Sequence, residues 1–140
     1  MVNILDPWVV EEARKRLRSH SDLLKTIWAE VEKLQIQYHS NTESKLWQQP
    51  DLNSKDGQKL VKWTIFCLAE ELFELANALK NRPWVNTEYP VDVNRLYDEL
   101  ADAAIFFIIL CHQLRLSPEK LAEIVIRKAV VNEWRIKSKY

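Results

Sequence analysis

Glycine is almost absent from this chain, which has one, Gly57, among its 140 residues. Loops that cradle phosphate and folds that bind dinucleotides need several glycines, because the backbone must approach the phosphate closely there. The sequence therefore excludes a P-loop or a Rossmann-type nucleotide site.

Cysteine and long apolar runs are scarce as well. Cys67 and Cys111 lie in apolar stretches without zinc-finger spacing, so we expect two reduced core residues. The longest apolar run, residues 103–111, is about half of the ~20 residues that a membrane span needs. The N-terminal residues lack the charged and apolar regions of a signal peptide. We therefore expect a cytoplasmic protein that does not enter a membrane.

The charges are balanced, with 20 Lys and Arg against 20 Asp and Glu. No global field draws such a chain to nucleic acid or to an anionic membrane surface, so any phosphate binding must be local. The length of the chain is that of one domain, and we treat residues 1–140 as a single domain.

Apolar residues recur at helical spacing along most of the chain, and no stretch alternates as a strand does. The pattern predicts an all-α fold, a bundle of about five helices, with a long loop at residues 40–57. The helices are expected at about residues 7–18, 21–39, 58–82, 91–114 and 118–136. Pro83 is expected to end the third helix, and Ser117-Pro118 to begin the last.

Two of these helices carry acids on faces that are otherwise apolar. At 100° per residue, Glu71 and Glu74 lie within about 60° of each other, and Glu70 lies about 40° beyond Glu74. Glu99 and Asp102, three residues apart, repeat the feature on the next helix. Acids at this spacing are usually a solvated face, but unpaired carboxylates among apolar neighbours are costly. A shared Mg²⁺ site, built from oxygen ligands, is an equally good interpretation of the pattern.

A polar stripe is expected on the last helix. Lys128, Asn132 and Arg135 fall within about 60° of one another. They are suited to hold phosphate oxygens and a sugar or base, or they form a solvated helix end whose cations the helix dipole favours. Spacing alone favours the solvated end.

Taken together, Glu70-Glu71-x-x-Glu74 and Glu99-x-x-Asp102 resemble the signature of the all-α nucleotide pyrophosphatases, the MazG-like and dimeric dUTPase superfamily. The dimeric dUTPases are the closer match, over about residues 30–140. Further elements resemble that group in the same order: Lys33 to Thr42, Trp47, Leu60 to Trp63, Glu71 to Leu75, Lys80, Trp84, Lys128, Asn132, Arg135 and Tyr140.

The resemblance implies a Mg²⁺-dependent hydrolase that converts a nucleoside triphosphate, most simply dUTP, to the monophosphate and pyrophosphate. It implies that Glu71, Glu74, Glu99 and Asp102 bind Mg²⁺ with Glu70 as ligand or support, and that Glu71 or Glu74 accepts a proton from the attacking water. It also implies substrate contacts from Gln35, His39, Trp47, Lys80, Lys128, Asn132, Arg135 and Tyr140.

The chain departs from the family pattern at positions expected to determine selectivity for the base of the nucleotide. His39 stands where the family usually has an amide, and Arg135-Ile136 and Lys139-Tyr140 replace its usual Arg-Gln and Gly-Tyr. The extra helices of longer members are missing. A MazG-like enzyme, or one acting on dCTP or a modified nucleotide, is therefore an alternative, and a helical interaction module is the non-enzymatic one.

The aromatic residues and the overall apolar content give two more expectations. Trp63 is expected to pack in the core, while Trp47 in the long loop is the better candidate for a lid over a base. His20 and His112 are given no role. A short all-α chain with this many apolar faces cannot cover them alone, so we expect a homodimer or a higher homo-oligomer.

Overall fold

A computed structural model describes residues 7, 22–42 and 45–137, with the side chains of the last helix described as far as Lys128. Four helices, and no strand, occur in these residues: α2 (Leu23–Thr42), α3 (Lys55–Ala78), α4 (Val93–Gln113) and α5 (Pro118–Lys137). The predicted all-α class is confirmed. The helix expected at residues 7–18 lies, apart from Pro7, outside the described residues.

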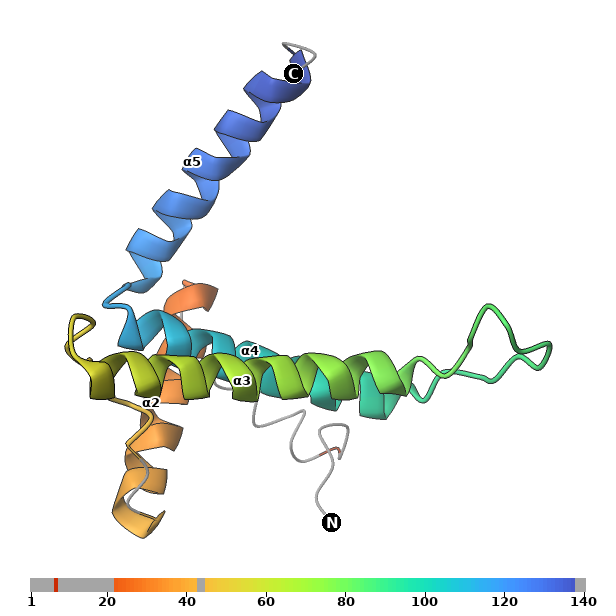
Figure 1. Ribbon diagram of the computed structural model, residues 1–140, viewed down its shortest axis with the longest axis horizontal. Helices are drawn as coiled ribbons and strands as arrows, with labels where there is room; N and C mark the ends of the chain where they lie inside the picture. The colour runs from red at the N-terminus through yellow and green to blue at the C-terminus, as the bar shows by residue number, and fades with distance from the viewer. Residues whose placement is uncertain (1–6, 8–21, 43–44, 138–140) are drawn as a thin grey trace.

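Helices α3 and α4 form a long antiparallel hairpin, joined by the loop at residues 79–92 (Figure 1). Small side chains allow the two helices to approach: Thr64 and Ala78 of α3 and Ala103 of α4 are all buried. Close approach of the two backbones is what brings the acids of both helices within reach of one another.

The apolar core lies where α2 crosses the end of this hairpin. Its buried side chains are Trp28 and Val31 of α2 with Ile108, Ile109 and Cys111 of α4. Leu46, Trp47, Ile105, Phe106, Leu116 and Leu121 pack around them. Cys111 is buried within this core, as expected. The same expectation is wrong for Cys67, which is only half-buried on α3 and lies outside the core.

Helix α3 begins and ends earlier than its apolar pattern predicts. Ser54 caps its start by accepting a hydrogen bond from the Gly57 amide at 2.9 Å, which shortens the preceding loop. A Cβ at Gly57 would overlap the Asp51 carbonyl oxygen, so this turn requires glycine. At the other end the helix stops at Ala78, and the Leu79 amide donates to the Ala76 carbonyl at 3.2 Å. Pro83 is therefore not what ends the helix.

A tight cap separates α4 from α5. Arg115 adopts a φ of 61°, and the Leu116 amide then reaches the Cys111 carbonyl oxygen at 2.9 Å. Ser117 accepts a hydrogen bond from the Lys120 amide and so caps α5, as its sequence predicts. The first turn of α5 is tied to α2 by an ion pair between Lys25 Nζ and Glu119 Oε1 at 2.8 Å. Beyond this turn, α5 points away from the other helices (Figure 1).

Large apolar side chains remain exposed on α3 and α5. The exposed fractions are 61% for Trp63, 66% for Phe66 and 70% for Phe73 on α3, and 57% for Val125 and 63% for Ile126 on α5. The expectation that Trp63 packs in the core is wrong for the single chain, because its side chain lies on the face of α3 that turns away from α4.

In the described residues no single helix has both the length and the hydropathy of a membrane span. Helix α4 and residues 118–128 of α5 meet that test only when they are taken together, and the chain bends by 100° between them.

Candidate metal centre

Three carboxylates from the two predicted acidic motifs meet between α3 and α4. Glu71 of α3 and Glu99 and Asp102 of α4 each offer an oxygen, and these oxygens all lie within 4.8 Å of one another. Glu71 and Glu99 are half-buried, and Asp102 is exposed. The hairpin thus gathers acids that are far apart in sequence into one cluster with an open side.

Burial and the crowding of negative charge raise the pKa of Glu71 and of Asp102. Burial raises the pKa of Glu71, and the charges of Asp102, Glu74, Glu99 and Glu70 raise it further. Burial also raises the pKa of Asp102, with added repulsion from Asp98 and Glu99. A divalent cation would relieve this repulsion, since it neutralises several carboxylates at once.

The guanidinium group of Arg95 lies beside the cluster, and the sequence pattern alone gave this residue no role. Arg95 Nε donates to Glu99 Oε1 at 3.3 Å across one turn of α4. The spacing in the sequence could have indicated this contact, because Arg and Glu four residues apart on a helix are neighbours. This bond holds one oxygen of Glu99 and so orients the carboxylate beside Glu71.

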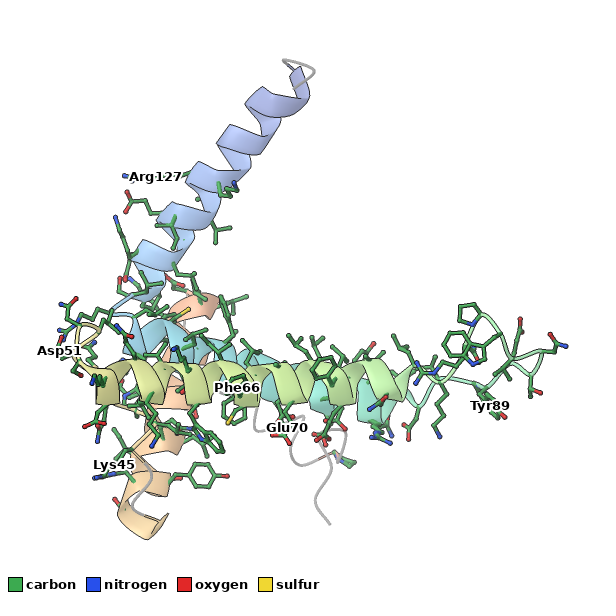
Figure 2. The ribbon with its side chains drawn as sticks, in the orientation of Figure 1. Lys45, Asp51, Phe66, Glu70, Tyr89 and Arg127 are labelled. Atoms are coloured by element: carbon green, nitrogen blue, oxygen red, sulfur yellow. The ribbon has the colours of Figure 1, made fainter. Side chains whose placement is uncertain are left out.

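Glu70 and Glu74 are outside the group of three. Both are exposed on α3, and their influence on Glu71 is the repulsion that raises its pKa. Figure 2 shows Glu70 on the same side of α3 as Phe66, which lies one turn earlier in the helix. The structure therefore brings together three of the five predicted ligands and leaves Glu70 on a different face.

The predicted substrate contacts on α2 and in the following loop have contrasting surroundings. Gln35 is buried and His39 is exposed on the last turns of α2. Trp47 stacks on His112 of α4, with ring centroids 3.8 Å apart and planes inclined by 7°. The adjacent Gln113 donates through Nε2 to the Leu46 carbonyl at 2.8 Å. These contacts tie Trp47 to α4, which is not the arrangement of a free lid, and they give His112 a packing role that the sequence analysis did not assign.

The remaining predicted contacts are dispersed. Lys80 is exposed in the chain that follows α3, and Lys128 is exposed on α5. Asn132 and Arg135 belong to α5, but their side chains, like Tyr140, lie outside the described part of the chain. Lys128 belongs to α5, and this helix leads away from the α3–α4 hairpin after its first turn (Figure 1).

The raised pKa values predict how pH affects metal binding. Mg²⁺ competes with protons for the carboxylates, so its affinity should be constant near neutral pH and fall as pH is lowered. The fall should begin at a higher pH than for carboxylates with ordinary values of about 4. Calorimetric titration with Mg²⁺ at a series of pH values measures this. An affinity that stays constant, or rises, as the solution is acidified would contradict the cluster as the binding site.

The donor set fits Mg²⁺, a hard cation that takes carboxylate oxygens and keeps other positions for water and substrate phosphate. Comparison of the chain with protein-family profiles, with curated proteins and with solved structures finds no match.

Proposed function

We propose that this protein is a Mg²⁺-dependent nucleoside triphosphate pyrophosphohydrolase, and that its preferred substrate is dUTP. The observation that supports the proposal is the convergence of Glu71, Glu99 and Asp102 from two helices on one open position. The resemblance of both acidic motifs to the all-α pyrophosphatases connects that position with cleavage of a triphosphate.

In this proposal the three carboxylates hold Mg²⁺, and Arg95 keeps Glu99 oriented toward the cluster through its 3.3 Å bond. Bound Mg²⁺ would supply activation of water and neutralisation of phosphate charge. Glu74 lies on the exposed side of α3, close enough to raise the pKa of Glu71. Glu71 or Glu74 then accepts the proton of the attacking water, and no nucleophilic side chain is needed.

Self-association completes the proposed enzyme. Helix α5 points away from the α3–α4 hairpin that carries the acidic cluster of the same chain. We therefore assign Lys128, Asn132 and Arg135 of α5 to contacts with the phosphates and the base at the site of a second copy. His39 and Gln35 of α2 remain the proposed contacts of the base edge, with Gln35 shielded from solvent.

The deciding experiment is incubation of the protein with each nucleoside and deoxynucleoside triphosphate in Mg²⁺, with pyrophosphate measured as product. Release from dUTP above all others is expected, because a pocket that hydrogen-bonds a base edge leaves its polar groups unpaired with the wrong base. Asn132→Ala should lower the catalytic efficiency for dUTP, and His39→Asn should preserve or sharpen the preference for uracil.

Other outcomes of this experiment would favour a different function. Equal turnover of dUTP, dCTP and dTTP, unchanged in both variants, would keep the pyrophosphohydrolase and reject the dUTPase. Preference for dCTP or a modified nucleotide would identify the MazG-like alternative. Absence of pyrophosphate release from every substrate, together with absence of Mg²⁺ binding, would leave a helical interaction module.

A further inference from the structure

One face of α3 is exposed along the length of the helix. Seven side chains on it fall within about 80° around the helix axis. In chain order they are Lys55, Lys59, Lys62, Phe66, Glu70, Phe73 and Asn77, and all seven are exposed. Thr64, which is fully buried, lies on the opposite side of the helix, where α4 packs. We call these seven residues the outer face of α3.

The outer face combines exposed aromatic rings with charged side chains. Phe66 is 66% exposed and Phe73 is 70% exposed, values far above those of apolar side chains in a core. Neither Lys62 nor Glu70 forms an ion pair within the described part of the chain, although Lys25, Arg95, Lys120 and Arg127 do. Exposed apolar area flanked by charges of both signs is typical of a protein interface.

The order of these residues is self-complementary. Lys62 and Glu70 are each four residues from Phe66, on opposite sides of it, and Lys59 and Phe73 are each seven residues from it. Phe66 is also at the middle of the 24-residue helix. An antiparallel copy of the same helix, related by a two-fold axis at Phe66, would therefore place Lys62 opposite Glu70, Lys59 opposite Phe73 and Lys55 opposite the polar Asn77.

We propose that the outer face of α3 is the surface on which a second copy of this chain docks, with the two α3 helices antiparallel about Phe66. Each Lys62 then pairs with Glu70 of the second copy, and this pair occurs twice. The Lys59 stem lies against the Phe73 ring of the second copy, where its ammonium group gains a cation–π contact. The two Phe66 rings meet at the axis, and α3 overlaps its copy over about 36 Å.

The hollow beside the outer face fits this occupant. Its lining holds four lysines and one acid, together with aromatic rings: Lys45, Lys55, Lys59, Lys62, Asp56, Trp63 and Phe66. In the antiparallel arrangement the acidic half of the second α3, with Glu70 and Phe73, faces this basic and aromatic hollow. Charge and apolar surface are thus matched together.

The arrangement also bears on the acidic cluster. Because α3 and α4 are antiparallel, the α4–α5 junction of each chain lies beside the N-terminal end of its own α3 (Figure 1). The antiparallel copy brings that junction to the half of α3 that holds Glu71. The inference rests on the homodimer proposed above but not on the metal chemistry, and it makes Glu70 an interface residue.

Charge reversal tests this directly, with light scattering as the readout of mass. The native chain is expected as a dimer of twice 16.6 kDa at micromolar concentration. Lys62→Glu and Glu70→Lys each place two like-charge pairs in the interface, so each should weaken dimerisation at least ~10-fold. The double variant restores opposite charges and should return the dissociation constant to within a few-fold of the native value. Glu88→Lys, which makes the same change in the exposed loop at residues 79–92, is the control and should have no effect.

A cross-link tests the register independently of affinity. Phe66→Cys in a Cys67→Ser background should form a disulfide between two copies with oxidised glutathione, because position 66 meets itself at the axis. A native monomer, a dimer that both reversals leave unchanged, or a double variant as weak as the single ones would each overturn the proposal. Circular dichroism confirms that each variant remains helical. Mg²⁺ titration of the native protein and of Lys62→Glu, which leaves all the acids near the cluster unchanged, reports separately on the metal site, so a failed interface and a failed metal centre are distinguishable.

Discussion

Replacement of Glu71 by Gln is expected to abolish Mg²⁺-dependent pyrophosphate release, with a loss of at least ~100-fold in kcat/KM. Gln keeps the size and one oxygen of Glu but removes the charge that the metal requires. Asp102→Asn should have an effect of the same order, because its carboxylate belongs to the same group of three. Both variants are measured by pyrophosphate release and by calorimetric Mg²⁺ titration.

The same two variants should fold normally and gain stability when metal is absent. The folded state raises the pKa of both carboxyls, so it binds protons more tightly than the unfolded chain does. These groups therefore stabilise the fold at low pH, and that contribution is lost as pH rises through their folded pKa values. Neutral replacements remove the repulsion, and the melting temperature at neutral pH should rise by a few degrees.

Asp56→Asn is the matched control, since Asp56 is exposed at the other end of the same helix. It should leave both turnover and metal affinity unchanged. Near-normal turnover of Glu71→Gln in Mg²⁺ would show that the cluster is not the metal site of the reaction. Loss of helical content in that variant would instead assign Glu71 a role in folding.

The Ile109→Ala variant is expected to lose about 3 kcal/mol of folding stability. Ile109 is 1% exposed and lies in the centre of the core that joins α4 to α2. Truncation removes the transfer free energy of the side chain and leaves a cavity, and such changes cost roughly 2–5 kcal/mol. Urea unfolding followed by circular dichroism measures the loss.

Ile109→Val is the graded control and should cost roughly 0.5–1.5 kcal/mol, since it removes a single methylene. Under conditions in which Ile109→Ala is still folded, Mg²⁺ affinity should be native-like, because the core and the acidic cluster lie at different positions along α4. A loss below ~1 kcal/mol for the alanine variant would mean that the core of the single chain is looser than its burial indicates.

The local features of the fold could be predicted from sequence because their causes are local. Ser117-Pro118 marks the start of α5, since a cap and a first-turn proline act within one turn. The end of α3 was harder to predict: its apolar pattern continues past Ala78, and the helix stops where the loop at residues 79–92 leaves for α4. That loop is fixed by contacts such as the Tyr89 amide donating to Asn81 Oδ1 at 2.7 Å.

The candidate site likewise has a part that local sequence could predict and a part that depends on contacts between helices. Spacing alone placed acids on the inner faces of two helices, because helical periodicity determines which residues share a side. It could not choose among Glu70, Glu71 and Glu74, which lie close together around the axis. The rotation of α3 against α4 decides that choice, and it is set by the small buried residues Thr64, Ala78 and Ala103.

By itself the sequence determined the helical class, the Ser117 cap of α5 and the two acidic motifs, because each depends on neighbours within a turn or two. The tertiary structure alone decided which carboxylates meet, that Trp47 stacks on His112, and that α5 points away from the other helices after its first turn. These features depend on contacts between residues far apart in sequence. The left-handed conformation of Arg115, a position where the sequence has no glycine, begins the turn after which α5 points away from the other helices and leaves Val125 and Ile126 exposed.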